Sequence, residues 1–196
     1  MTRILFRCDA SLLIGSGHII RCRTLARQLR RCGAEIIFIC RSQPGDLIGF
    51  LKHEFKTLTL PVQPLSSTQN EYRINLDGRD LYAAWLGCSQ LQDAKDTSDI
   101  LKKEGLSNID WLVVDHYGLD IIWQEHVRTD LSSSNKSQPK CLVIDDLADR
   151  KHMADLLLDQ NFFGDFQDQR YKTLVSNECV QLLGPHYALL GPEYAH

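Results

Sequence analysis

Short apolar runs alternate with amphipathic helical segments along the 196 residues of this chain, and this alternation constrains its fold more than any other feature. The apolar runs that predict strands cover residues 3–8, 34–40, 55–60, 110–115 and 141–145, followed by shorter runs at 156–159 and 180–183. Helices are predicted over 17–31, 44–53, 90–105 and 119–131. Residues 61–80 are polar and irregular, with a surface loop predicted over 63–70, and a second polar loop is predicted over 132–139. Near-continuous apolar strands between helices are typical of a parallel sheet covered on both faces. We therefore expect an α/β fold with a Rossmann-like sheet in one domain over residues 1–190.

The charge of the chain is unevenly distributed. Its net charge of −3 argues against general binding of nucleic acid. The first 41 residues nevertheless hold eight arginines against Asp9 and Glu35, a local excess of six positive charges. Two interpretations are open: these arginines help to attract a phosphorylated ligand, or most of them form the solvated face of one helix.

The seven cysteines lack the spacing of a disulfide framework or a zinc site. Their number is odd, and no two of them form a C-x-x-C pair. Cys8, Cys40 and Cys141 lie in or beside apolar runs, where free thiols behave as small hydrophobic side chains. Arg3 and Arg7 interrupt any signal peptide, and no stretch approaches the roughly 20 apolar residues of a membrane span. We therefore expect a protein of the reducing cytoplasm without a membrane partner.

Polar residues follow the end of each predicted strand. In a parallel sheet the carboxyl ends of the strands meet at one edge, and ligands bind there. The polar groups at these positions are Asp9 with the turn 15–18, Asp115-His116-Tyr117-Gly118, Asp145-Asp146, Asp159-Gln160-Asn161 and Gly184-Pro185-His186-Tyr187. We expect these five groups to gather along a single edge of the sheet, and their convergence carries more weight than any one motif.

The turn Ile14-Gly15-Ser16-Gly17-His18 holds the sharpest candidate residue. Glycines let the backbone approach a ligand closely, and a helix N-terminus offers free N–H groups with a partial positive charge. That charge favours a neutral imidazole at His18, which a general base needs. A capping or hydrogen-bonding histidine is the alternative. The glycine spacing matches neither a dinucleotide fingerprint nor a P-loop, so the turn by itself is also consistent with a simple strand–helix connection.

Two further groups after strands carry candidate chemistry. Asp115-His116-Tyr117 would bring a second imidazole and a phenol to the same edge. Alternatively, Asp115 caps the next helix and His116 makes a structural hydrogen bond. Asp145-Asp146 is a candidate for binding a metal or orienting a histidine, although paired acids after a strand more often cap a loop or helix, and no third carboxylate lies at an evident metal spacing.

Motifs along essentially the whole chain together resemble a known enzyme family. They include Asp9-Ala10-Ser11, Gly15-Ser16-Gly17-His18, Ala84-Trp85-Leu86-Gly87, Asp115-His116-Tyr117-Gly118, Asp145-Asp146-Leu147-Ala148-Asp149-Arg150, Asp159-Gln160-Asn161 and Gly184-Pro185-His186-Tyr187. In this order they resemble the hydrolases that release UDP from UDP-2,4-diacetamido-2,4,6-trideoxy-β-L-altropyranose in pseudaminic acid biosynthesis. That family looks like a GT-B glycosyltransferase turned hydrolase, with two Rossmann-like domains and the substrate between them. The resemblance implies that this chain is the N-terminal half of such a fold.

The resemblance also implies roles for particular residues. His18 stands at the position of the family's catalytic histidine, which activates water for attack on the anomeric carbon, so that UDP leaves with inversion of configuration. No cofactor and no metal ion are implied. The residues expected to bind the UDP-sugar substrate are Gly15, Ser16, Gly17, Arg21, His116, Tyr117 and Asn161.

The sequence departs from the family pattern at its end. The family continues into a second domain that usually holds the nucleotide, whereas this sequence stops shortly after Leu190-Gly191-Pro192, with Gly191 in place of an expected arginine. We expect residues 191–196 to begin an interdomain linker and an absent C-terminal domain to hold UDP. Two other interpretations are a sugar-binding Rossmann-like domain without turnover and an incomplete fragment of a GT-B glycosyltransferase relative.

Overall fold

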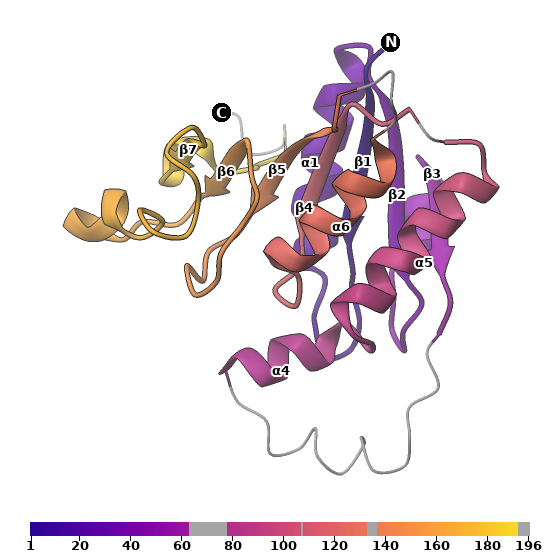
Figure 1. The fold of residues 1–196 in the computed structure, drawn as a ribbon, viewed down its shortest axis with the longest axis horizontal. Helices are drawn as coiled ribbons and strands as arrows, with labels where there is room; N and C mark the ends of the chain where they lie inside the picture. The colour runs from indigo at the N-terminus through magenta and orange to yellow at the C-terminus, as the bar shows by residue number, and fades with distance from the viewer. Residues whose placement is uncertain (63–77, 107, 133–136, 192–196) are drawn as a thin grey trace.

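Seven parallel strands form a single sheet in the computed structural model, which describes residues 1–62, 78–106, 108–132 and 137–191. The strands are β1 (Arg3–Cys8), β2 (Glu35–Arg41), β3 (Lys56–Leu60), β4 (Trp111–Asp115), β5 (Lys140–Ile144), β6 (Leu156–Asp159) and β7 (Val180–Leu183). Their order across the sheet is β3-β2-β1-β4-β5-β6-β7 (Figure 1). This is the strand order of a doubly wound Rossmann-like sheet with one further strand at its edge. The predicted fold class is therefore confirmed.

Helices cover both faces of the sheet. The helices α1 (Gly17–Arg31) and α2 (Ile48–Lys52) pack on one face, and α5 (Gln90–Lys103) and α6 (Ile121–Leu131) pack on the other. The helix α4 (Gly78–Trp85) lies below the carboxyl ends of the strands in Figure 1. Short 3-10 helices, Gly164–Gln169 and Pro185–Tyr187, follow β6 and β7. Within the described ranges, no helix is long and apolar enough to cross a membrane.

Most element boundaries follow the sequence prediction within two residues. β1, β6, β7 and α1 have the predicted limits, and Gly33 adopts a left-handed conformation (φ +90°) just after α1. The predicted strands 34–40 and 141–145 are each displaced by one residue, and those at 55–60 and 110–115 begin one residue later. Side-chain caps fix the starts of two helices: Ser89 accepts a hydrogen bond from the Gln92 N–H before α5, and Asp120 accepts one from the Ile122 N–H before α6.

The prediction is wrong at two places between β2 and α5, one before β3 and one after it. The helix expected over 44–53 is confined to its second half, because Gly45 is left-handed (φ +79°) and Asp46, before the helix, accepts the N–H of its first residue, Ile48. The helix α4 was not expected, since residues 61–80 are mostly polar. The loop predicted at 63–70 lies outside the described residues, as do all but the first residue of the predicted linker 191–196.

Most arginines of the N-terminal segment form ion pairs with acidic side chains of the fold. Arg23 and Arg27 both bind Glu54 at the surface, and Arg3 binds Glu35. Arg7 and Arg41 are buried against Asp93. The local excess of positive charge is therefore largely neutralised inside the structure rather than displayed to a ligand, although most arginines of α1 do lie at the surface.

The buried carboxylate of Asp93, in the first turn of α5, connects the two buried arginines, Arg7 and Arg41. It accepts hydrogen bonds from Nε and Nη2 of Arg7 (3.0 and 2.7 Å), from Nε and Nη2 of Arg41 (3.1 and 2.8 Å), and from Trp123 Nε1 (2.9 Å). Burial alone disfavours the carboxylate, but attraction to Arg7 and Arg41 outweighs burial and lowers the pKa of Asp93 to about 2. One side chain thus ties β1 and β2 to α5 and α6.

Replacing this carboxylate tests its contribution. We expect Asp93→Asn to lower the free energy of unfolding by about 3–5 kcal/mol, because it removes the buried charge that Arg7 and Arg41 share and leaves each guanidinium group with a single acidic partner, Asp9 or Asp96. Urea unfolding followed by circular dichroism measures the change. Asp99→Asn, on the exposed face of the same helix, is the matched control and should leave stability unchanged. A loss below about 1 kcal/mol for Asp93→Asn would contradict the assigned role.

Candidate active site

The candidate site lies where the strand order reverses, between β1 and β4. These two strands pair in parallel, with Cys8 opposite Asp115 at their carboxyl ends. The chain leaves β1 toward α1 on one face of the sheet and leaves β4 toward α6 on the other face. The loops that follow such neighbouring strands diverge, and doubly wound sheets bind their ligands at this point. Residues from both loops form the site.

His18 and Asp115 form a buried pair. His18 Nδ1 lies 2.6 Å from Asp115 Oδ1, and the two side chains are 7% and 0% exposed. Because the ionised carboxylate can only accept, Nδ1 carries the hydrogen of this bond. Arg21 Nη2 lies 3.2 Å from the same Nδ1 but can only donate, and its hydrogen goes to Asp115 Oδ1 at 2.6 Å. The lone pair of the neutral imidazole is then on Nε2. Among the described residues Nε2 has no hydrogen-bond partner, so it is the atom available to accept a proton.

Several donors converge on Asp115. Arg21, one turn after His18 on α1, donates from Nε to Oδ2 and from Nη2 to Oδ1, each at 2.6 Å, and the Cys22 thiol donates to Oδ2 at 3.4 Å. Burial alone disfavours the carboxylate, yet His18 and Arg21 outweigh it and hold the pKa of Asp115 well below its usual range. Asp115 therefore orients His18 and does not cap the following helix, because that cap is Asp120.

An aromatic cluster packs against His18. The Tyr117 ring meets the His18 ring edge to face, with centroids 4.6 Å apart. Tyr82 and Trp85 of α4 pack against Tyr117 at 5.1 and 6.0 Å. Burial and the nearby Asp146 carboxylate raise the pKa of the Tyr117 phenol, so the phenol stays protonated at neutral pH. The cluster gives the site an apolar wall beside the histidine.

His116 reaches this region but points inward. It is 2% exposed, its Nδ1 accepts a hydrogen bond from the Gly118 N–H at 2.9 Å, and its Nε2 lies 3.5 Å from Asp9 Oδ2. His116 thus makes the structural hydrogen bond of the alternative interpretation, and its contact with a substrate stays a prediction.

The remaining predicted site residues occupy two different places. Gly15 is left-handed (φ +78°), and its N–H donates to the Ser11 carbonyl oxygen at 2.8 Å. Ser16 directly precedes α1 but makes no side-chain capping bond, so the exposed run Gly15–Gly17 leads straight into the uncapped first turn that holds His18. Asn161 follows β6, two strands from β4, and its N–H donates to Asp159 Oδ1 at 3.0 Å.

Sequence reasoning missed the contribution of α4. Tyr82 and Trp85 come from this helix, and Arg79 at its start donates from Nη1 to the Tyr117 carbonyl oxygen at 2.6 Å. The signal that pointed to this segment was the motif Ala84-Trp85-Leu86-Gly87, which carries part of the family resemblance.

The two carboxylates of Asp145-Asp146 have different partners. Asp146 accepts from Arg21 Nη1 at 3.3 Å, whereas Asp145 is buried against Arg150.

Comparison with known proteins supports the family resemblance. The chain is 28% identical over 192 residues to the UDP-2,4-diacetamido-2,4,6-trideoxy-beta-L-altropyranose hydrolase of Campylobacter jejuni. The match covers 98% of this chain and 53% of that enzyme, so the chain spans about half the length of the curated relative it matches. No protein family model matches the chain. The sequence-based resemblance to these hydrolases is thus confirmed.

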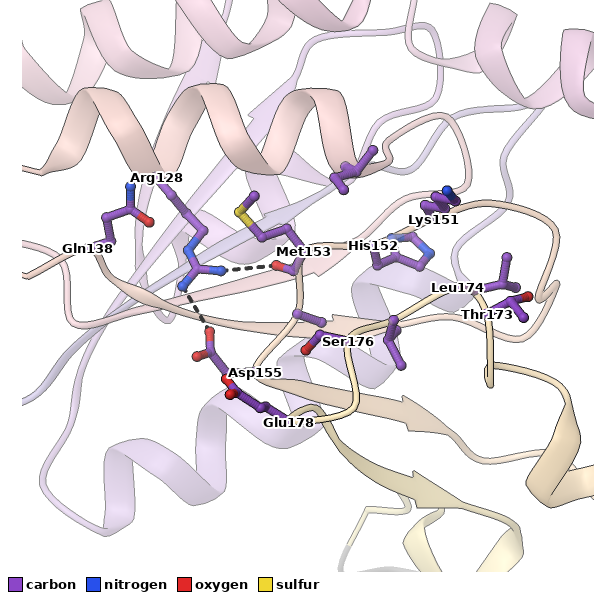
Figure 2. A pocket seen from close by; sticks show the side chains of 13 residues that line it. Arg128, Gln138, Lys151, His152, Met153, Asp155, Thr173, Leu174, Ser176 and Glu178 are labelled. Carbon is purple, nitrogen blue, oxygen red and sulfur yellow. Dashed lines mark hydrogen bonds and ion pairs between the residues drawn. The ribbon is translucent and has the colours of Figure 1, made fainter.

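Other parts of the structure lie away from this chemistry. Within the described ranges, no group of three or more His, Cys, Asp or Glu residues is arranged to hold a metal ion. A pocket of 510 Å³ lies at the opposite edge of the sheet, near the starts of β5, β6 and β7 (Figure 2). There Arg128 donates to the Met153 carbonyl oxygen and pairs with Asp155, each at 3.1 Å. This ion pair links α6 to the residue that directly precedes β6.

Two buried histidines make stability depend on pH. Burial lowers the pKa of His116 and of His152 to about 4, below the ordinary value of 6.5. The unfolded chain therefore binds more protons, so this contribution to stability is complete above pH ~6.5 and is lost as the pH falls toward ~4. We expect the free energy of unfolding to fall by up to about 1.4 kcal/mol per pH unit for each histidine. Urea unfolding across this range measures the slope. His116→Gln should reduce it, and a slope of zero in the wild type would contradict the assignment.

Proposed function

We propose that this chain carries the catalytic base of a UDP-sugar hydrolase and forms the N-terminal Rossmann-like domain of a GT-B-like enzyme. The observation that carries the proposal is the buried His18–Asp115 pair at the switch point, which leaves Nε2 of the imidazole as a proton acceptor. The similarity along 98% of the chain to a hydrolase of UDP-2,4-diacetamido-2,4,6-trideoxy-β-L-altropyranose supports this substrate class. The products are UDP and the free sugar, in a step of pseudaminic acid biosynthesis.

In the proposed reaction His18 Nε2 takes a proton from a water molecule while the water oxygen bonds to the anomeric carbon. The bond between the anomeric carbon and the diphosphate oxygen breaks, and UDP leaves with the electron pair. Water enters opposite the leaving group, so the configuration inverts. Asp115 accepts the Nδ1 hydrogen throughout and stabilises the imidazolium that forms. A diphosphate is a good leaving group, which lessens the need for a general acid.

The surroundings of His18 suit such a substrate. Tyr117, with Tyr82 and Trp85 behind it, offers aromatic surface to the methyl groups of a deoxy, acetamido-substituted sugar. The uncapped first turn of α1 after Gly15-Ser16-Gly17 presents N–H groups and a partial positive charge that favour a diphosphate. Arg21 offsets the charges of Asp115 and Asp146, which reduces their repulsion of an anionic substrate.

The exposed apolar side chains favour a second domain over the same edge. Leu12 and Leu13 follow β1, Phe162 and Phe166 follow β6, and Leu190 follows β7; these side chains are between 61% and 82% exposed. Exposed apolar groups gathered on one side of a protein mark an interaction surface. We propose that the C-terminal domain covers this edge, holds the UDP moiety and encloses the sugar beside His18. The relative is about twice as long as this chain, which supports the proposal.

Release of UDP from the nucleotide sugar tests the base. We expect His18→Gln to lower the rate of UDP release by about 10²- to 10⁴-fold, because the amide cannot accept the proton of water. His126→Gln, at an exposed position on α6, is the matched control and should keep the wild-type rate. A His18→Gln variant as fast as the wild type would eliminate His18 as the base. Sugar binding without UDP release by the wild type would favour the non-catalytic domain instead.

The orienting role of Asp115 has its own test. Asp115→Asn keeps the shape of the side chain, but its amide can also donate, so the hydrogen of the imidazole can move to Nε2. We expect kcat to fall at least about 100-fold with little change in KM, because the wrong tautomer cannot accept a proton. Steady-state kinetics on the UDP-sugar measure both constants. A change confined to KM would instead assign Asp115 to substrate binding.

A further inference from the structure

The orientation of the His116 ring is fixed by its two nitrogen atoms. Nδ1 accepts the Gly118 N–H at 2.9 Å, so in the neutral ring the hydrogen is on Nε2. Nε2 faces Asp9 Oδ2 at 3.5 Å; Asp9 directly follows β1 and lies 107 residues earlier in the chain. Both atoms are buried, and within the described residues neither has a hydrogen-bond partner. Each buried atom therefore faces the other across a 3.5 Å contact.

Asp9 is itself held rigidly. Its Oδ1 accepts Arg7 Nη1 at 2.6 Å and the Arg41 N–H at 2.7 Å, and the whole side chain is buried. Arg7 and Arg41 are fixed in turn by Asp93. Asp9 Oδ2 is thus an anchored acceptor at the end of β1, supported by the ion network beneath the site.

Tyr117, which packs on His18, directly follows His116 in the chain. The turn around Tyr117 is also in close contact with α4. Arg79 donates to the Tyr117 carbonyl oxygen, and a Cβ on Gly118 would lie 2.6 Å from the Tyr82 carbonyl oxygen. Tyr117 therefore lies between His116, which accepts the Gly118 N–H, and Gly118, which packs closely against α4.

We propose that His116 and Asp9 are positioning residues, whose contact sets the placement of Tyr117 against His18 across the β1–β4 boundary. His116 acts through Tyr117 and does not touch the substrate. Its depressed pKa, about 4, agrees with a neutral donor at working pH. The inference extends the proposed function, yet its geometry exists without turnover and can be tested separately.

Two substitutions separate the two nitrogens of His116. His116→Gln keeps a donor near the Nε2 position, and His116→Asn keeps an acceptor near the Nδ1 position but loses the donor toward Asp9. In protein labelled with ¹³C-histidine, the ring current of Tyr117 shifts the signals of His18, and loss of that shift in Tyr117→Leu calibrates the probe. We expect His116→Asn to move the His18 signals toward those of Tyr117→Leu, and His116→Gln to keep them near the wild type. The exposed pair His126→Asn and His126→Gln are the controls.

Activity gives a second readout. We expect His116→Asn to lower kcat for UDP release by about 10-fold or more, with His116→Gln restoring most of it and both keeping the pH midpoint of the wild type. An unchanged His18 signal in His116→Asn, or equal disturbance by both variants below their melting temperatures, would overturn the inference. Loss of the acidic limb of the pH profile would make His116 a catalytic residue and also overturn it. If the wild type releases no UDP, the proposed function fails while the His18 signals still decide this inference.

Discussion

A row of buried aspartate–arginine pairs along the carboxyl edge of the sheet is the interaction on which the rest of the structure depends. Each aspartate ends or follows a strand, where the parallel arrangement brings several carboxylates together in a region removed from water. Buried carboxylates in such a place are costly unless a cation and further donors compensate them. The pairs are Asp9 with Arg7 (2.6 Å), Asp115 with Arg21 (2.6 Å), Asp145 with Arg150 (2.7 Å) and Asp159 with Arg170 (3.5 Å).

The closeness of the arginine contact decides whether the pKa of each buried carboxyl group is lowered or raised. Asp145 is as buried as Asp115, and attraction to Arg150 and His152 outweighs that burial, so the pKa of Asp145 is lowered. The Arg170 contact with Asp159 is longer, and there burial prevails and raises the pKa of Asp159. The phenol of Tyr171 bridges the two acids at 3.1 Å each. Asp115 differs from the others because its ionised oxygen also accepts the hydrogen of His18 at the edge of the site. Because Asp115 binds His18 as well as Arg21, this ion pair also orients the imidazole that can accept a proton.

Several features of the site were open to prediction because they are local. The apolar runs fixed the strands and therefore which polar residues follow them, as with Asp115 after β4 and the turn before His18 after β1. The glycine-rich turn leading into α1 was likewise visible in the sequence. The partner of His18 was not, since its hydrogen bond to Asp115 joins residues 97 positions apart. The inward direction of His116 was also hidden, because it depends on Asp9 across a strand boundary. The contribution of α4 was not predicted because the preceding segment is largely polar. Tyr82 and Trp85 become part of the site only through their packing on Tyr117.

The sequence by itself determined the alternation of elements, the parallel sheet, the chemistry available after each strand and the likeness to a family of nucleotide-sugar hydrolases. Periodicity and turn residues act over a few positions, so a single sequence expresses them directly. The tertiary structure alone decided which of the polar groups at the sheet edge meet. The strand order places β1 beside β4, and that order follows from long-range pairing and from packing two apolar cores against helices on opposite faces. The free energy of those contacts depends on residues far apart in the chain. For this reason no local sequence pattern predicts that His18 lies against Asp115.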